Sequence, residues 1–441
     1  MRISSGNRVA GTFLGNENGS FAVMTAAIMA VLTLSAGFAI NLAQLHNVRS
    51  NLGQALDAAV TSTARDITTG KIEAKDARDR VELFLKANTD GDMIAGDRLV
   101  LDTLVIDKAK STVEATAYVD VDLYFPLFGL SDERRVSNLS AAVYSDKKIE
   151  VAMMLDVTGS MGGQKINDLK AAANNAIDAF LTGQDAANPR VRVAIVPYAD
   201  AVNTGSLNNV VFAETSYTAV NVEPPKLDDP MAAAASGGWD DCATERKGTQ
   251  QFTDASPYVA KVNRDYRLDF CPNAVLKPLS ADIGGLKSTV KSFKADGFTG
   301  GHIGIQWTWY MLSPQWKDVL PKAAQPLPYD KKKVAKYAIL MTDGEFNTAF
   351  AGVAKKGDTH GQASLSRKNA EKLCDAMRND GIEIFSVGFK LKESSAKGVM
   401  KNCANKDTSS IRHYYETSSG DELNEAFLEI AHNIERLAIT K

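Results

Sequence analysis

The chain has 441 residues, 44% hydrophobic and 23% charged, which excludes a disordered protein and allows more than one hydrophobic core. The formal net charge is -3, and the most basic block is the short run Lys331–Lys333. The sequence therefore lacks the cluster of basic residues that would favour binding to nucleic acid.

The first element in chain order is a long apolar segment near the N-terminus. No Asp, Glu, Lys or Arg occurs from residue 18 to 48, and residues 21–43 are long enough to cross a bilayer core, which needs about 20 helical residues. We expect a membrane span. A cleaved signal peptide is the alternative, but its apolar core is usually only about 7–15 residues long. Arg2 and Arg8 precede the span, which predicts a cytoplasmic N-terminus over residues 1–17 and an exported remainder.

Two further regions precede the main domain. Apolar residues recur at helical spacing beyond the span, so we expect residues 18–67 to form a spanning helix that continues, or kinks near Gly53, into an amphipathic one. Residues 68–146 combine a helix around 74–86 with two alternating segments, 112–125 and 134–145, that are typical of half-buried strands. This pattern predicts a helix and a small β-rich spacer module between the membrane and the main domain.

Residues 147–441 alternate between strand and helix patterns. Short apolar runs, typical of strands buried on both faces, occur at residues 148–156, 191–198, 336–344 and 382–389. Helical patterns separate them at residues 166–181, 304–312 and 366–381. This order predicts an α/β domain with a doubly wound, mostly parallel sheet, in which ligands bind at the carboxyl ends of the strands.

A segment of about residues 200–281 inside this domain has little periodicity and is longer than an ordinary connection. We interpret it as a long insert that either carries partner specificity or is a surface elaboration without a partner. The four cysteines have no zinc-site spacing, so we expect disulfides between Cys242 and Cys271 and between Cys374 and Cys403; the alternative is four buried thiols.

The candidate chemistry lies at the ends of predicted strands. Asp156, Thr158 and Ser160 occupy alternate positions directly after an apolar run, so their oxygens can face one point. Thr299, in a glycine-flanked loop, and Asp343, at the end of another strand, add a hydroxyl and a carboxylate. Because Mg²⁺ prefers oxygen ligands, we expect these five residues to bind Mg²⁺, or alternatively Mn²⁺ or Ca²⁺. The set leaves a coordination position for an acidic group of a protein partner.

These residues resemble a known motif. The pattern D-x-[ST]-x-S, a later isolated threonine and T-D-G is similar to the metal-ion-dependent adhesion site of von Willebrand factor type A domains, with Thr158 where serine is usual. The resemblance implies a Rossmann-like fold and the metal ligands Asp156, Thr158, Ser160, Thr299 and Asp343.

A second resemblance covers most of the chain. The apolar segment leading into ALDAAVTSTA, the insert with WDDCATERKG, the stretch GGHIGIQWTWYMLSP and the closing SGDELNEAFLEIAHNIERL resemble TadG-like proteins of bacterial tight-adherence (Flp-type) pilus systems. This implies a single-pass inner-membrane protein with a periplasmic or surface-facing main domain. Its implied role is pilus assembly or surface adhesion, through protein partners such as components of the pilus system.

Two other function classes are alternatives. A membrane-tethered scaffold would use the helices and the spacer and leave the metal site idle. A phosphatase-like hydrolase would use Asp156 as nucleophile, but such enzymes need a second acid where this chain has Thr158, and no H-E-x-x-H, G-x-S-x-G or P-loop motif occurs. We therefore expect a binding protein and not an enzyme. His302 is interpreted as a bystander, and Glu345 either lines the rim of the site or faces water.

Overall fold

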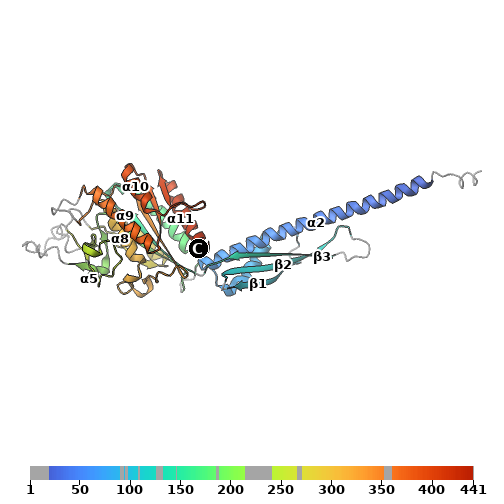
Figure 1. Cartoon of the computed structure of the whole chain (residues 1–441), viewed down its shortest axis with the longest axis horizontal. Coiled ribbons are helices and arrows are strands. Elements are labelled where there is room, and N and C mark those ends of the chain that lie inside the picture. Colours follow the sequence, from blue (N-terminus) through green and yellow to red (C-terminus); the bar gives the residue numbers. More distant parts are fainter. Residues whose placement is uncertain are drawn as a thin grey trace, which may run out of the picture. The chain divides into compact units, whose positions relative to one another are not determined.

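The structure is a computed structural model, and the residues that it describes are 19–89, 94, 98–107, 110–125, 133–145, 147–184, 188–213, 241–265, 271–351 and 360–440. The contacts divide the chain into two compact units, and Figure 1 labels some of their elements. The first contains residues up to Ala64 together with Ala74–Val143, and the second contains Arg65–Glu73 and Tyr144–Lys441. The predicted cytoplasmic N-terminus, residues 1–17, lies outside the described residues.

A single long helix dominates the first unit. Helix α2 (Gly19–Thr69) runs without a break from the apolar segment into the amphipathic one, as predicted for residues 18–67. Among the described residues it is the one helix long and apolar enough to cross a membrane, with a mean hydropathy of 2.1 in a window that is only 6% buried. Farther along the helix, Val48, Leu52, Leu56 and Val60 are buried in the core of the unit. The same helix is therefore exposed and apolar first, and amphipathic afterwards.

A three-stranded antiparallel sheet completes the first unit. Its order is β1 (Leu99–Asp107), β2 (Thr112–Asp122) and β3 (Glu133–Val143), and helix α3 (Ala77–Asn88) precedes it. The predicted helix and two strands are present. Strand β1 was not predicted from the sequence, because a register shift between Leu101 and Thr103 interrupts its alternation of buried and exposed residues.

The second unit is an α/β domain with a central six-stranded sheet. The strand order is β10 (Lys277–Ser280), β5 (Val191–Tyr198), β4 (Lys148–Asp156), β11 (Val334–Thr342), β12 (Glu383–Phe389) and β13 (Tyr414–Thr417). Strands β5, β4, β11, β12 and β13 are parallel, whereas β10 pairs antiparallel with β5, so the sheet is mixed. Its chain order reverses between β4 and β11, and in such sheets ligands bind where the order reverses.

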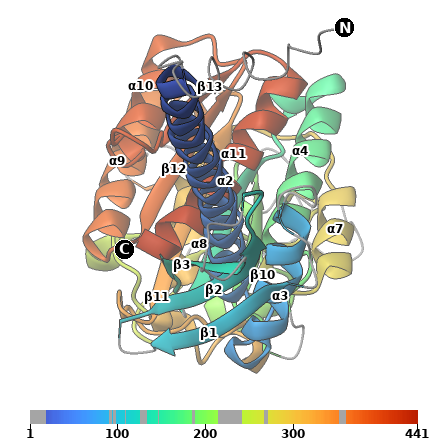
Figure 2. The same ribbon diagram turned by 90° about the vertical axis from the view of Figure 1, so that its right-hand side faces the viewer.

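Helices cover both faces of this sheet. Helices α4 (Gln164–Leu181), α7 (Ile283–Lys291) and α11 (Gly420–Thr440) share one buried core with Val151, Met153 and Leu155 of β4. Helices α8 (Gly301–Leu312), α9 (Ala363–Asn379) and α10 (Ser394–Cys403) share the other core with Ala152 and Met154. Figure 2 shows α4 and α7 on one side of the strands and α9 and α10 on the other. Strand β4 is therefore buried on both faces, as its uninterrupted apolar sequence predicts.

The insert is only partly within the described residues. Strand β6 (Val202–Asn203) pairs with β8 (Cys242–Ala243), β7 (Phe212–Ala213) pairs with β9 (Val262–Asn263), and a short helix, α5, spans Asn208–Val211. Residues 214–240 and 266–270 lie outside the described part. Both predicted disulfides are present, Cys242–Cys271 within the insert and Cys374–Cys403 between α9 and α10. The alternative of four buried thiols is therefore wrong.

Helix α8 has no charged residue, and all of its residues are buried. Trp307, Trp309 and Tyr310 belong to the core. The helix approaches the strands closely at Gly304, where an added Cβ would lie 2.7 Å from Cγ of the buried Tyr198 and 3.1 Å from Cε of Met154. This helix therefore packs against the strands without room for a methyl group at Gly304.

Gly304→Ala is expected to lower the free energy of unfolding by about 1–3 kcal/mol, because overpacking outweighs the better helix propensity of alanine. Thermal unfolding followed by tryptophan fluorescence reports this change, since the described tryptophans are buried in this domain. Gly398→Ala in α10 is the matched control: nothing lies within 4 Å of its added Cβ, so it should stabilise by about 1 kcal/mol. Equal effects of the two substitutions would contradict the tight packing at Gly304.

Candidate metal centre

Three segments of the second unit bring the predicted ligands together. Strand β4 ends at Asp156, and a short 3-10 turn, Gly159–Met161, follows it. Strand β11 ends at Thr342, directly before Asp343. Thr299 lies in the loop before α8. Because β4 and β11 are parallel neighbours, their carboxyl ends meet at one edge of the sheet.

Hydrogen bonds and one close contact between hydroxyl oxygens connect four of the five residues. The Thr158 hydroxyl donates to Oδ1 of Asp156 at 2.6 Å, and the Thr158 backbone N–H donates to the same oxygen at 2.9 Å. The hydroxyl oxygens of Thr158 and Ser160 are 2.9 Å apart. The Ser160 hydroxyl donates to Oδ1 of Asp343 at 2.5 Å. Two carboxylates from different strands are thus linked through two hydroxyls.

Thr299 lies beside the same group of oxygens. Its Oγ1 and the Oγ of Ser160 would be 3.2 and 3.3 Å from a Cβ added to Gly344. A side chain at Gly344 would therefore fill the space that the hydroxyls share. The Thr299 loop is fixed by Asn347, whose Oδ1 accepts a bond from the Thr299 N–H at 2.9 Å and whose own N–H donates to the Thr299 carbonyl at 3.0 Å. Sequence analysis did not identify Asn347.

The Asp156 side chain is fully buried, and burial disfavours the charged form of its carboxylate. Burial, and to a lesser extent the nearby Asp343 carboxylate, raise its pKa to about 6, although the hydrogen bonds from Thr158 act in the opposite direction. Its Oδ2 accepts bonds from the Tyr198 hydroxyl at 3.0 Å and the Thr342 hydroxyl at 2.8 Å. Both supporting residues end buried strands of the same sheet, and this position is the signal that could have identified them. A bound cation would offset the repulsion between the two carboxylates.

Lys165 provides a positive charge that the sequence analysis missed. Its Nζ lies 2.6 Å from Oδ2 of Asp343, and the Asp343 side chain is fully buried. Lys165 is in the first turn of α4, where the helix dipole disfavours a cation. The ion pair with Asp343 therefore offsets an unfavourable position. Lys165 is the protein's own counter-ion at this site.

The donor set fits a hard cation. The predicted ligands are two carboxylates and three hydroxyls, and oxygen ligands of this kind suit Mg²⁺, Mn²⁺ or Ca²⁺. Among the described residues, no three or more His, Cys, Asp or Glu side chains gather at one place, so the donors characteristic of a structural zinc site are not combined there. The site opens to solvent at Ser160, which lines a pocket of about 230 Å³ together with Lys165, Asp343 and the exposed Glu345.

His302 lies in a different, fully buried network. Its Nδ1 is 2.9 Å from the Ser366 hydroxyl, and its Nε2 is 3.1 Å from Oε2 of Glu245. Glu245 also accepts bonds from the N–H groups of Phe350 and Ala351, in the segment that follows β11. A serine, a histidine and a glutamate in line resemble a catalytic triad, but all three are buried and no substrate can reach them. This network joins the insert to the segment after β11.

Comparisons with known proteins complete this description. No protein-family model and no curated protein matches the chain. Among solved structures, the chain is similar to the vWF domain of the type V pili tip protein Mfa5 from Porphyromonas gingivalis, with 13% identity, a TM-score of 0.39 and coverage of 67% of this chain and 97% of that one. For the pilus adhesin SpaC from Lactobacillus rhamnosus GG, the identity is 10%, the TM-score 0.39 and the coverage 77% and 34%.

A third similar structure is proximal thread matrix protein 1 from the mussel byssus, whose structure has a zinc-occupied MIDAS motif. The identity is 14%, the TM-score is 0.31, and the match covers 67% of this chain and 46% of that one. At identities and TM-scores this low, the likeness says nothing of what this chain binds.

Proposed function

We propose that this chain is a membrane-anchored envelope protein whose α/β domain binds a divalent cation and, through it, an acidic group of a protein partner. The observation that carries the proposal is the convergence of two carboxylates and three hydroxyls from three chain segments at the carboxyl ends of β4 and β11. The resemblance to TadG-like proteins supports a role for this binding in pilus assembly or surface adhesion within a tight-adherence pilus system.

Asp156, Thr158, Ser160, Thr299 and Asp343 would hold the ion, and the ion would attract an anionic ligand as a Lewis acid. Two carboxylates balance the charge of one divalent cation, and the hydroxyls add no further negative charge. The ammonium group of Lys165 adds positive potential at the pocket. A carboxylate from a partner is therefore favoured at the position that the protein leaves open.

The continuity of α2 supports a retained membrane anchor over a cleaved signal peptide. The helix passes from its exposed apolar part into the buried core of the first unit without interruption. The two disulfides fit an oxidising compartment outside the cytoplasm. We therefore propose an inner-membrane protein with its N-terminus in the cytoplasm and its α/β domain exported.

A hydrolase would need an accessible nucleophile at Asp156. Both oxygens of this carboxylate accept hydrogen bonds from buried neighbours, and the side chain has no exposed surface. We therefore retain the binding protein as the proposal. A membrane-tethered scaffold with an idle metal site is the outcome expected if the next experiment fails.

A free Mg²⁺ concentration of about 100 times the dissociation constant is expected to stabilise the second unit by about 2.7 kcal/mol. An ion that binds only the folded state shifts the unfolding equilibrium toward that state. Asp156→Ala should abolish the shift. The measurement is the melting temperature of the purified chain in detergent, with and without Mg²⁺, followed by tryptophan fluorescence. Asp178→Ala removes a half-exposed carboxylate from α4 and should keep the full shift. If Asp156→Ala and the parent respond alike, the metal hypothesis fails.

Lys165→Met is expected to tighten Mn²⁺ binding about tenfold, because it removes a positive charge that competes with the ion for Asp343. Isothermal titration calorimetry of the purified chain measures the dissociation constant. Lys170→Met removes the same charge from the same helix at a position that does not line the pocket, and should leave the constant unchanged. Weaker binding by Lys165→Met would show instead that the lysine supports the ligand geometry.

A further inference from the structure

The end of β2 lies against the apolar part of α2 within the first unit. The Asn41 side chain donates to the Phe125 carbonyl at 2.6 Å and accepts from the Phe125 N–H at 3.1 Å. Gln44 makes a second such pair, donating to the Asp122 carbonyl at 2.8 Å and accepting from the Tyr124 N–H at 3.3 Å. Two amide side chains of the helix thus pair with the backbone that continues β2.

A glycine allows the close approach. A Cβ added to Gly37 would lie 3.3 Å from Cβ and 3.4 Å from Cγ of Phe125. The Asn41 side chain is almost completely covered, with the residue only 4% exposed. These contacts therefore hold Phe125 at a fixed position along the axis of α2, between Gly37 and Gln44. This position along the axis is called its height below.

This height matches the end of a membrane span. The exposed large apolar side chains of α2 extend from Val23 to Leu42. At 1.5 Å per residue, about 20 residues cross a hydrocarbon core of about 30 Å. A core that begins near Val23 therefore ends near Leu42, so Asn41 and Gln44 lie where the hydrocarbon core meets the interfacial layer.

Two aromatic side chains are exposed at this height. Tyr124 is 70% exposed and Phe125 is 46% exposed, although strand β2, which precedes them, buries its valines and alanines. Charged pairs begin directly behind the aromatic residues, with Arg98 on Asp122 at 2.6 Å and Arg135 on Asp120 at 2.9 Å. In membrane proteins, aromatic rings lie at the boundary between the acyl chains and water, and charged side chains lie on the water side of that boundary. Tyr124 and Phe125, followed by the two ion pairs, have this order.

We infer that Tyr124 and Phe125 form a second membrane contact, which inserts into the interfacial layer of the bilayer that α2 crosses. The occupant is a lipid surface, because the aromatic rings continue the exposed apolar surface of α2 at the height where that surface ends. The contact fixes the depth of the helix, since the paired amides of Asn41 and Gln44 tie the strand to the span. This inference rests on the proposed membrane anchoring.

The test is the full chain reconstituted in phosphatidylcholine vesicles with a minority of phosphatidylglycerol, using Phe125→Trp. The added tryptophan emission should be blue-shifted and should be quenched when the lipids carry bromine on their acyl chains. Tyr124→Trp gives a second readout, and the unsubstituted chain is subtracted as background. Val143→Trp is the matched control, because Val143 is 51% exposed but pairs with Thr112, about 33 Å along the sheet from the end of β2. Its emission should stay unquenched.

Each other outcome overturns the inference. If the chain floats with the vesicles but Phe125→Trp and Tyr124→Trp behave like the control, the membrane contact is wrong while the anchor stands. If the emission is blue-shifted without quenching by brominated lipid, a second copy of the chain covers the rings. If the chain does not float with the vesicles at all, the proposed anchoring fails, and the inference fails with it.

Discussion

Glu150→Ala is expected to lower the free energy of unfolding by about 3–5 kcal/mol, because it removes the carboxylate that balances two positive charges at this site. The Glu150 carboxylate is fully buried and accepts hydrogen bonds from Arg192, from Lys336 and, at 3.0 Å, from the Leu327 N–H. Lys336 is itself buried, and burial lowers the pKa of its ammonium group while Glu150 counteracts that effect. Without Glu150, the buried Lys336 ammonium group loses the carboxylate that counteracts its burial, and Arg192 loses its ion pair.

Urea unfolding of the purified chain, followed by tryptophan fluorescence, measures the loss. Glu416→Ala is the control, because its ion pair with Lys397 is largely exposed and should contribute less than about 1 kcal/mol. Adding Lys336→Met to Glu150→Ala should recover part of the loss, since it removes one of the unpaired charges. A loss from Glu150→Ala as small as that of the control would contradict a buried ion-pair network.

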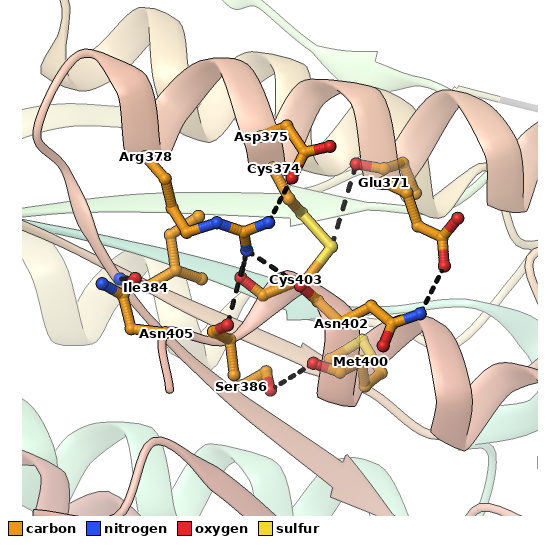
Figure 3. Close-up of a disulfide and its surroundings, with 12 residues drawn as sticks. Glu371, Cys374, Asp375, Arg378, Ile384, Ser386, Met400, Asn402, Cys403 and Asn405 are labelled. Atoms are coloured by element: carbon orange, nitrogen blue, oxygen red, sulfur yellow. Dashed lines mark hydrogen bonds and ion pairs between the residues drawn. A yellow bond between two sulfur atoms is a disulfide. The ribbon is translucent and has the colours of Figure 1, made fainter. Parts of the chain in front are cut away.

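Replacing both Cys374 and Cys403 by alanine is expected to cost about 3.5 kcal/mol of folding stability. The bridge closes a loop with a sequence separation of 29 residues, and a loop of that length loses about this much chain entropy on closure. The bridge joins α9 to the last residue of α10, and Figure 3 shows Arg378 and Asn402 beside it. Arg378 donates to the Asn402 carbonyl at 2.9 Å, and Asn402 donates to Glu371 at 2.8 Å.

The second bridge provides the matched comparison. Cys242–Cys271 has the same sequence separation, so its replacement by two alanines should cost the same if chain entropy decides the effect. The measurement is again urea unfolding under non-reducing conditions. A loss below about 1 kcal/mol at Cys374–Cys403 alone would mean that Arg378 and Asn402 hold the two helices together without the bridge.

The buried strands of the second unit could be predicted almost to the residue. The predicted runs 148–156 and 191–198 coincide with β4 and β5, because strands covered on both faces need an unbroken apolar sequence. Strands β10 and β13 were missed. Each has four residues at an edge of the sheet, so neither needs a long apolar run. The antiparallel direction of β10 comes from its connection, which the sequence does not encode in a local pattern.

The candidate site likewise has one part that the sequence predicts and one part that it does not. Asp156, Thr158, Ser160, Thr299 and Asp343 carry a local pattern and were predicted as a set, and the structure brings them together. Their supporting residues depend on tertiary contacts. Lys165 reaches Asp343 across 178 residues of sequence, and Tyr198 reaches Asp156 from the neighbouring strand. A lysine in the first turn of a helix was the one local sign of this pairing.

The shortness of the two edge strands of the six-stranded sheet also affects solubility. Long unpaired edges recruit the edges of neighbouring molecules, which leads to aggregation. Strands β10 and β13 each offer only four residues, and Pro278 in β10 lacks a donor N–H. At high local concentration, the six-stranded sheets of neighbouring copies can therefore form few strand-to-strand hydrogen bonds with one another. Contacts between copies would then depend on loops and side chains.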